Sequence, residues 1–501
     1  MYFIGYDLGS SSLKTALVDS ETGETLTVIK TPAEELAIDA PHPNWAEQDP
    51  ELWWKCICEG TRELLSKTKA APESISGIGI AYQMHGLVTL DVAGQCVRPA
   101  IIWCDSRAVS IGEQTLEELG EQRCQAQLLN VPGNFTASKL RWVQQEEPEA
   151  FKKIKTFLLP GDYIAYRLSG KAQTTASGLS EGILWDFQKG HPAYWLLGHW
   201  GMPDSLIPEI VPTFGHQSKV SKSGARDTGL SEGTPILYRA GDQPNNAFTL
   251  NVLEPGIVAA TGGTSGVLYG ITDSPEVKEL RRFNHFLHVN HTPDHPRIGQ
   301  LLCINGAGSL YRWLKDQLDV SGYDEMNTLA EAVPVGSDGL LCFPFGNGAE
   351  RMLDNKSIGG SFSGLEFNRH HKGHLCRAAL EGIAFAFRYG MELMEESGLP
   401  FKTIRAGNDN LFQSDIFTTT LAALGQTTIE LFEVTGAVGA ARACMVQKLG
   451  LEEYIERTAG RNYLATILPV KEVEDYRIAL SLIHISEPTR PAPLSRMPSS
   501  A

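Results

Sequence analysis

At 501 residues the chain is too long for one ordinary hydrophobic core, so its length predicts two or more domains and allows a cleft between them. Hydrophobic residues make up 42% and charged residues 20%, a balance that argues against wholesale disorder. With 43 basic and 59 acidic residues the formal net charge is −16, and no lysine or arginine run is long enough to follow a nucleic-acid backbone. Nucleic acid is therefore not expected as a partner.

Segments that direct a chain into a membrane or out of the cell are not expected. No apolar run approaches the roughly 18 residues of a membrane span, and Tyr2 to Asp7 lack the basic and apolar regions of a signal peptide. The nine cysteines are scattered without a CxxC pair and are expected to be reduced. These features predict a cytoplasmic protein that binds no membrane.

Two β-hairpins with tips of small residues are predicted, one at the start of each half of the chain. The strand, tip and strand of each are 2–6, 7–12 and 13–18 for the first, and 256–260, 261–266 and 267–269 for the second. Such tips let backbone N–H groups approach a phosphate closely, although most of them are ordinary turns.

Helices and strands alternate along the rest of the chain. A helix is expected from Pro50, with Asp49 as its N-cap, and a later helix carries apolar residues at four-residue spacing from Leu375 to Phe387. The β runs that follow the first helix are 75–81 and 87–91. This alternation predicts α/β domains.

The last part of the chain differs from the rest in composition. From about residue 480 it becomes proline-rich and loses all periodicity. We expect residues 481–501 to be unstructured or not native to the protein, and leave them out of the fold prediction. If they replace a native final helix or strand, the second domain loses stability.

Neither the P-loop pattern GxxxxGK[ST] nor a GxGxxG fingerprint occurs in the chain. A phosphate-bearing ligand would therefore be held by the hairpin tips. Lys14 follows the first tip as a local cation, and Asp7 precedes it as a carboxylate that can hold a hydrated Mg²⁺. Asp7 can also accept hydrogen bonds from its own turn amides, and the two roles are compatible.

Several segments, in order along residues 1 to 480, resemble the FGGY carbohydrate kinases. The segments are Asp7–Ser12, Trp45–Pro50, Gln83–Gly86, Trp103–Arg107, Ala240–Gln243, Gly263–Ser265, Arg377–Gly382 and Gly436–Ala441. The resemblance implies an α/β fold with two ribonuclease H-like domains, of the actin, hexokinase and Hsp70 type, on either side of a cleft. It places an N-terminal domain at 1–247 and a C-terminal, nucleotide-binding domain at 248–480. Relatives are often homodimers.

Among these kinases the chain is most similar to those that act on D-xylulose. The expected reaction is phosphorylation of D-xylulose to D-xylulose 5-phosphate by ATP with Mg²⁺. A sugar hydroxyl is a poor nucleophile, and a nearby carboxylate can take its proton as the phosphoryl group leaves. Asp242 is the candidate base; the alternative is an ordinary helix N-cap. Phosphate contacts are expected from the two tips, at Gly9, Ser10, Ser11, Ser12, Lys14, Gly263, Thr264 and Ser265.

Sugar contacts are expected around the segments that follow the predicted strands of the first half. An apolar or aromatic surface suits the C–H faces of a sugar, and polar side chains suit its hydroxyls. The candidates are Met84, His85, Trp103, Arg107, Asp242 and Gln243. A core histidine is the alternative for His85.

Two segments depart from the family's pattern or from expectation. The glycine-rich adenosine segment appears as Ala406–Phe412 with one glycine, so adenine contact is carried over only to Gly407 and Asn408. The histidine-rich segment 284–295 has no recognised metal-ligand spacing, and we predict a surface strand and loop there.

Other activities remain open from the sequence. Ribulose, gluconate or glycerol could replace D-xylulose as the acceptor. An actin-like ATPase without a sugar acceptor would also explain the hairpins, and a silent sugar-binding relative is a third alternative.

Overall fold

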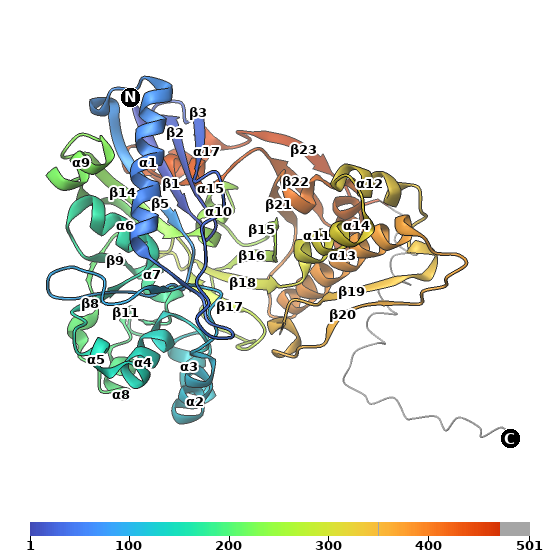
Figure 1. Cartoon of the computed structure of the whole chain (residues 1–501), viewed down its shortest axis with the longest axis horizontal. Coiled ribbons are helices and arrows are strands. Elements are labelled where there is room, and N and C mark those ends of the chain that lie inside the picture. Colours follow the sequence, from blue (N-terminus) through green and yellow to red (C-terminus); the bar gives the residue numbers. More distant parts are fainter. Residues whose placement is uncertain (349, 471–501) are drawn as a thin grey trace.

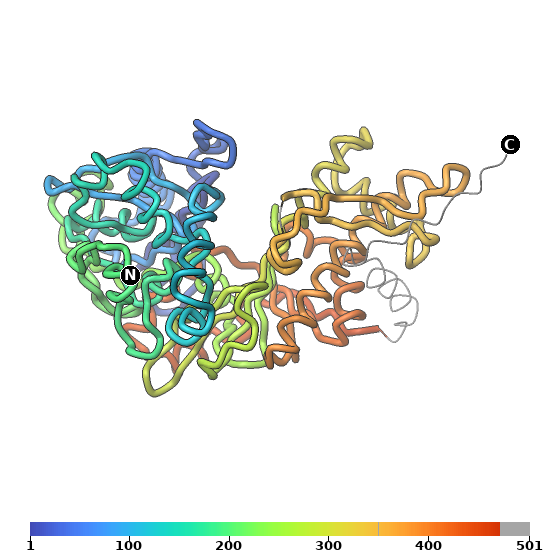
Figure 2. Tube along the Cα trace, turned by 90° about the horizontal axis from the view of Figure 1, so that it is seen from below, coloured from blue at the N-terminus to red at the C-terminus, as the bar shows by residue number. Residues whose placement is uncertain are grey.

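The structure is a computed structural model that describes residues 1–348 and 350–470. The predicted tail, 481–501, lies outside the described residues. Two lobes, each built around one large β-sheet, lie side by side (Figure 1). The view from below separates the blue-to-green first lobe from the yellow-to-orange second lobe (Figure 2).

The first lobe is built on a six-stranded sheet in the order β13-β14-β5-β1-β2-β3. Its strands are β1 (Tyr2–Leu8), β2 (Leu13–Asp19), β3 (Thr25–Thr31), β5 (Ile75–Tyr82), β13 (Phe214–Lys219) and β14 (Pro235–Gly241). β1 pairs antiparallel with β2 and parallel with β5, and β5 pairs parallel with β14. The carboxyl ends of β1, β5 and β14 therefore meet at one edge of the sheet.

Helices cover both faces of this sheet. One face carries α1 (Pro50–Thr68), α6 (Pro160–Ser169) and α9 (Lys222–Thr228); the other carries α10 (Asp242–Thr249), α15 (Gly436–Ala443), α16 (Val446–Leu449) and α17 (Leu451–Thr458). The side chain of Asp49 caps α1 by accepting a hydrogen bond from the Glu51 amide, as the sequence predicts.

α15 lies against the sheet with almost no space between the two backbones. A Cβ atom added to Gly5 would lie 1.9 Å from the carbonyl oxygen of Ala437, and one added to Gly79 would lie 1.9 Å from that of Ala440. Only glycine fits at these two positions. Residues 436–458, from the second half of the chain, thus pack on the first lobe. We still propose that the boundary between the two domains lies between residues 247 and 248.

A mixed layer between β5 and β13 completes the first lobe. Its elements are β6 (Val88–Leu90), β7 (Ala100–Ile101), α2 (Val109–Leu119), α3 (Glu121–Gln127), α4 (Thr136–Glu146), α5 (Pro148–Phe151), β8 (Thr156–Leu158), β9 (Gln173–Thr175), α7 (Ala176–Glu181), β10 (Trp185–Asp186), β11 (His191–Pro192), α8 (Tyr194–His199) and β12 (Glu209–Val211), with β4 (Glu47–Gln48) paired to β7. This layer places α7 and α4 next to the carboxyl edge of the large sheet.

The second lobe is built on a seven-stranded sheet in the order β17-β18-β16-β15-β21-β22-β23. Its strands are β15 (Ile257–Gly262), β16 (Gly266–Thr272), β17 (Asn284–Leu287), β18 (Ile298–Ile304), β21 (Thr403–Gly407), β22 (Thr428–Phe432) and β23 (Tyr463–Ile467). The other elements are α11 (Ala307–Leu318), α12 (Tyr323–Glu331), α13 (Lys372–Glu396), α14 (Asp415–Gly425) and the hairpin of β19 (Leu341–Phe345) and β20 (Gly359–Ser363).

The two sheets repeat one arrangement, because β15 pairs antiparallel with β16 and parallel with β21 just as β1 pairs with β2 and β5. Both predicted hairpins are confirmed, and so is the α/β class with two sheet domains. The first tip is shorter than predicted, because β1 continues to Leu8 and Asp7 pairs with Lys14 inside the hairpin.

The prediction of a surface strand and loop in the histidine-rich segment is confirmed for the loop, where residues 292–295 are exposed, and wrong for the position of the strand. β17 is a strand, but all four of its residues are buried, and His285 and His288 are each 1% exposed. Phe286 packs in a core shared with the first lobe, so this edge of the second sheet is covered by α7. None of the helices in the described ranges combines the length and apolar character that a membrane crossing needs.

Candidate active site

Asp7 and Asp242 come together at the carboxyl edge of the first sheet. Asp7 lies near the end of β1, and Asp242 is the first residue of α10, directly after β14. Both side chains are partly buried, so each keeps an open side. Two strands far apart in sequence thus bring two carboxylates to one place.

The electrostatics of this pair favour a proton on Asp242. Burial, and next the negative charge of Asp7, raise the pKa of Asp242 from 3.8 to about 7, against the lowering effect of the backbone amide of Gln243. Burial also raises the pKa of Asp7, and the charge of Lys14 opposes that rise. Asp242 can therefore hold or release a proton near neutral pH.

The first hairpin tip lies beside this pair. Gly9 closes the tip by donating its N–H to the carbonyl of Ser12 at 3.0 Å, and Ser10, Ser11 and Ser12 are partly exposed. The N-terminus of α15 adjoins the same place, because a Cβ on Gly436 would lie 2.6 Å from Oδ2 of Asp7. Backbone donors and a helix N-terminus thus lie near the two carboxylates.

The second hairpin tip borders a cavity of about 290 Å³ in the second lobe. Gly263 and Thr264 line the cavity, and their carbonyls accept hydrogen bonds at 3.0 Å from the amides of Gly308 and Ser309 at the start of α11. The remaining lining comes from Gly262, Gly308, Tyr311, Arg312, Tyr323, Asp324, Asn327, Asn410, Leu411, Gln413 and Ser414. The cavity has both aromatic and amide groups.

Sequence reasoning missed most of these lining residues. Tyr311 and Arg312 lie in the second turn of α11, shortly after Gly306 and Gly308. This glycine pair is the sequence signal that could have indicated a binding site there. Gly407 ends β21 and Asn408 follows it, donating its amide N–H to the carbonyl of Phe432 at 2.8 Å. The cavity lining begins three residues after Gly407, at Asn410.

The two lobes approach each other around Lys14. Burial raises the pKa of Asp409 above its usual value, and a hydrogen bond with Asn410 and the positive charge of Lys14 oppose that rise. Lys14 belongs to the first lobe and Asp409 follows β21 in the second. The cation predicted to hold phosphate therefore lies in the first lobe, near Asp409 of the second lobe.

His85 follows β5 in a left-handed backbone conformation, with φ of 60°. Its Nδ1 lies 2.9 Å from the carbonyl of Glu181, and its ring packs edge-on against Phe135 at 4.8 Å. A carbonyl can only accept, so Nδ1 carries the hydrogen, while burial lowers the pKa of His85 to about 3. His85 is thus neutral, with Nε2 as a hydrogen-bond acceptor.

Glu181, the last residue of α7, is a buried carboxyl that sequence reasoning also missed. It accepts a hydrogen bond from the His85 amide at 3.4 Å, and a Cβ on Gly241 would lie 2.3 Å from its Oε2 and 2.6 Å from Cγ of Met84. Burial, and next the charge of Asp242, raise its pKa well above the usual value. Glu181 thus ties His85 to the start of α10.

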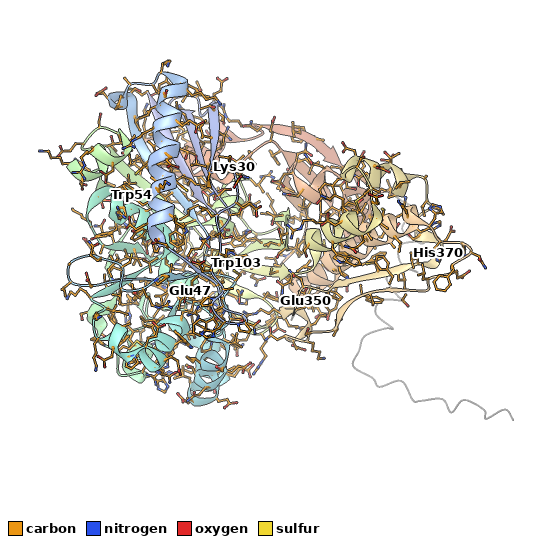
Figure 3. All side chains as sticks on the ribbon, viewed as in Figure 1. Lys30, Glu47, Trp54, Trp103, Glu350 and His370 are labelled. Carbon is orange, nitrogen blue, oxygen red and sulfur yellow. The ribbon has the colours of Figure 1, made fainter. Side chains whose placement is uncertain are left out.

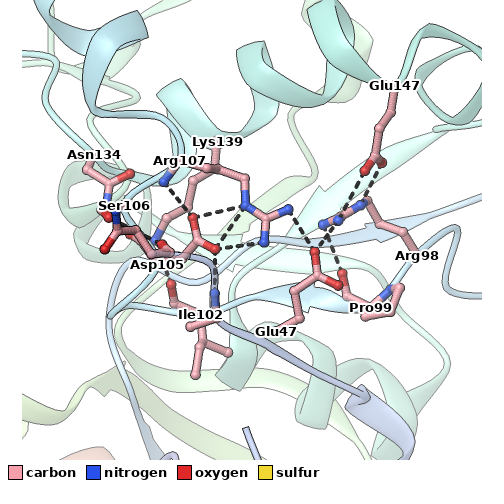
Figure 4. Close-up of polar contacts among 12 residues, drawn as sticks. Glu47, Arg98, Pro99, Ile102, Asp105, Ser106, Arg107, Asn134, Lys139 and Glu147 are labelled. Carbon is pink, nitrogen blue, oxygen red and sulfur yellow. Dashed lines mark hydrogen bonds and ion pairs between the residues drawn. The ribbon is translucent and has the colours of Figure 1, made fainter. Parts of the chain in front are cut away.

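Arg107 lies in a buried network of charges (Figure 4). Its guanidinium donates to both carboxylate oxygens of Asp105 and pairs with Glu47 at 2.7 Å, and it stacks 3.8 Å from the ring of Trp45. In turn Asp105 accepts the amide of Ala46 at 2.6 Å. Arg107 therefore fixes the loop that carries the neighbouring candidate residues.

Trp103 lies in the same loop, but unlike Arg107 it is exposed. It is 46% exposed, and its indole N–H lies 3.5 Å from Oγ of Ser10 in the first tip. Figure 3 shows Trp103 on the side of the first lobe that faces the second lobe, and Glu350 on the facing side of the second lobe. Gln243, in the first turn of α10, is partly exposed beside Asp242.

Comparison with known proteins agrees with this arrangement. Residues 2–249 match the N-terminal domain of the FGGY family of carbohydrate kinases, and residues 258–447 match its C-terminal domain. The xylulose kinase of Bacillus subtilis is 30% identical over 84% of this chain and 85% of its own length.

Solved structures share the whole fold. The xylulose kinase of Rhodospirillum rubrum superposes with a TM-score of 0.85 at 26% identity, over 97% of this chain and 98% of that one. The gluconate kinase of Lactobacillus acidophilus has the same TM-score at 21% identity and 97% coverage of both chains, which shows the fold alone. Family models and relatives together cover both lobes, and the chain is an ATP-dependent carbohydrate kinase that belongs to the FGGY family.

Proposed function

We propose that the chain phosphorylates D-xylulose to D-xylulose 5-phosphate, with Asp242 as the general base. The observation that carries the proposal is the placement of Asp242 beside Asp7 at the carboxyl edge of the first sheet, with a pKa raised to about 7. A base with a pKa near the working pH combines a useful ionised fraction with strong proton affinity.

The reaction needs one proton transfer and one phosphoryl transfer. Ionised Asp242 accepts the proton of the terminal sugar hydroxyl, whose oxygen forms a bond to the γ-phosphorus of ATP. The bond from that phosphorus to the β,γ-bridging oxygen breaks, and ADP leaves with the electron pair. Asp242 ends protonated and returns its proton to solvent.

Asp7 fits the proposed role in holding Mg²⁺. In the described part of the chain no group of three or more histidine, cysteine or acidic side chains gathers as a metal site. Mg²⁺ needs only one or two carboxylates, because phosphates and water complete its shell. Burial raises the pKa of both Asp7 and Asp242, and a bound Mg²⁺ would favour their ionised forms and neutralise charge on the phosphates.

The nucleotide is proposed to span both lobes. The tip residues Gly9 to Ser12 and Gly263 to Ser265 are proposed to hold the phosphates, with Lys14, on the strand after the first tip, as a local cation. The 290 Å³ cavity next to the second tip suits the adenosine, and Gly407 and Asn408, which do not line it, are retained as proposed adenine contacts just before its lining at Asn410. We retain the homodimer as a proposal.

The sugar is proposed to lie over His85. The Nε2 acceptor of His85 takes one hydroxyl, Gln243 offers an amide to another, and Trp103 supplies apolar surface. Met84 is only 4% exposed, and its contact with the sugar is proposed to be limited to that exposed part. Arg107 has its donors engaged by Asp105 and Glu47, so we assign it a positioning role rather than sugar contact.

Two arguments favour a neutral ketopentose. The relatives at about 30% identity are named xylulose kinases, and the segment Gln83–Gly86 lacks the Arg-Glu pair expected of glycerol kinases.

The test is ADP release from MgATP with D-xylulose, D-ribulose, L-ribulose, gluconate, glycerol or no sugar. We expect strong turnover with D-xylulose only, and a loss of about 10²–10⁴-fold in kcat in Asp242→Asn. Another preferred sugar would overturn the substrate, and an Asp242→Asn variant with wild-type kcat would overturn the base. Equal turnover without sugar would indicate an ATPase instead.

A further inference from the structure

Within residues 1–470, as far as the structure describes them, three chain connections join the lobes, and they enclose a second, small cavity of about 60 Å³. Thr249 to Asn251 lie between α10 and β15, Phe432 ends β22 before α15, and Thr458 to Arg461 lie between α17 and β23. Each of these segments leaves a helix packed on the first sheet or enters one. In Figure 1, α10, α15 and α17 lie on the side of the first lobe that faces β21 and β22. The cavity is therefore located where the lobes are joined.

Three arginines line this cavity: Arg405 from β21, Arg442 from α15 and Arg461 after α17. Among the described residues, one of the three has an ion pair: Arg405 bonds Glu430 at 2.8 Å. Three positive charges thus face one negative charge. Burial, and then the charge of Arg461, oppose protonation of Arg442 and lower its pKa to about 10.

Protein acceptors satisfy these guanidinium groups only in part. Arg405 Nη1 donates to the carbonyls of Leu250 and Asn251, at 3.3 and 2.9 Å. Arg442 donates Nε to the carbonyl of Gly23 at 2.9 Å and Nη2 to Asn462 Oδ1 at 2.7 Å. In the described ranges, Nε of Arg461 is buried without a hydrogen-bond partner. An acceptor with negative charge would satisfy the remaining donors.

We propose that this cavity binds a small tetrahedral oxyanion of the phosphate class. Guanidinium groups match the oxygens of a tetrahedral anion in geometry and charge. About 60 Å³ suits one free ion and not a nucleotide or a sugar phosphate. The site lies at the far end of α10 from Asp242, so it is separate from the proposed active site. An anion held there bridges all three connections between the lobes.

The test compares the full-length wild type with Arg461→Gln, titrating sodium phosphate against sodium chloride at matched ionic strength. Arg457→Gln is the matched control, because Arg457 lies on α17, pairs with Glu453 at 2.5 Å and does not line the cavity. Melting temperature and hydrogen exchange are the readouts, and neither depends on catalysis.

We expect phosphate to raise the melting temperature of the wild type and of Arg457→Gln in a saturable way, and to slow exchange in residues 249–257 and 458–463. In Arg461→Gln the apparent affinity should fall about tenfold or more. Without phosphate, that variant should melt no lower than the wild type, because it removes like-charge repulsion. Equal responses to phosphate and chloride, or an unchanged phosphate affinity in Arg461→Gln, would overturn the site. Sulfate in place of phosphate should act similarly if tetrahedral oxyanion chemistry is what the cavity recognises.

Discussion

Asp242 carries a stability cost that follows from its position. Its pKa is raised in the folded state, so folding favours the protonated form, and ionising the group costs stability. The cost is absent below the unfolded pKa of 3.8, grows between 3.8 and about 7, and is complete above that. Asp242→Asn should therefore be more stable than the wild type at pH 8, by on the order of 2 kcal/mol, and by less at pH 5.

Urea unfolding at pH 5 and pH 8 measures this difference. Asp204→Asn is the control, because Asp204 is exposed on the surface and should give equal stability changes at both pH values. A gain for Asp242→Asn that does not grow with pH would contradict the assigned pKa. The raised pKa of Asp242 therefore has two opposite effects. It makes the carboxylate a better base, and it lowers the stability of the folded protein when the group is ionised.

His85 offers a substitution that separates structure from sugar recognition. In His85→Asn the side-chain amide can still donate to the Glu181 carbonyl, and asparagine tolerates φ of 60°, but the Nε2 acceptor is lost. We expect a melting temperature close to that of the wild type, about a tenfold rise in KM for the sugar, and an unchanged KM for ATP. His85→Ala should lower the melting temperature as well. An unchanged sugar KM in His85→Asn would remove His85 from the sugar site.

At the scale of single elements, prediction from the sequence worked where the signal was local. The hairpins at 2–18 and 256–269 and the helix capped by Asp49 depend on alternation, small tips and a cap, all of which lie within a few residues. Histidine-rich β17 was placed on the surface because its burial depends on α7 of the other lobe. Glu181 was missed for a similar reason, since no local pattern marks it.

The contact of α15 with the first sheet is the clearest long-range feature, and it can be tested through Gly79. A Cβ there would lie 1.9 Å from the Ala440 carbonyl, so Gly79→Ala must push the helix away. We expect a loss of about 2 kcal/mol or more in the free energy of unfolding, with lower activity because Gly436 of α15 adjoins Asp7.

The matched control is Gly198→Ala. Gly198 lies in helix α8, and a Cβ there would have nothing within 4 Å, so alanine should be neutral or stabilise by about 0.5–1 kcal/mol. Equal effects of the two substitutions in urea unfolding would show that α15 does not lie so close to the sheet.

At the scale of the whole molecule, the sequence indicated the family and the order of its segments, but not how the two lobes meet. The resemblance named Gly436–Ala441 without showing that α15 packs on the first sheet, or that three connections join the lobes. Likewise, the tip at 263–265 was found, while most of the cavity beside it comes from α11, α12 and residues 410–414, far away in sequence. Local patterns do not specify such distant neighbours.

Phosphoryl transfer to a sugar and not to water requires the lobes to close around the bound reactants. The proposed contacts belong to different lobes: His85, Trp103 and the first tip to one, and the second tip with its cavity to the other. Trp103 is 46% exposed on the side that faces the second lobe, so closure should bury its indole (Figure 3). We therefore expect sugar with a non-hydrolysable ATP analogue to lower the radius of gyration in small-angle scattering, and to shift tryptophan emission to shorter wavelength.

Trp103→Phe removes the emission of Trp103 and leaves that of the other eight tryptophans of the chain. Comparing this variant with the wild type therefore shows how much of the emission shift comes from Trp103. In this variant the scattering change should remain and most of the emission shift should disappear, because phenylalanine keeps an aromatic surface but is not excited with tryptophan. Asp242→Asn should still close, since closure needs binding and not proton transfer. If neither the wild type nor Trp103→Phe becomes more compact with both ligands bound, the reactants must meet without lobe closure. The site would then have to exclude water through loops of the first lobe alone.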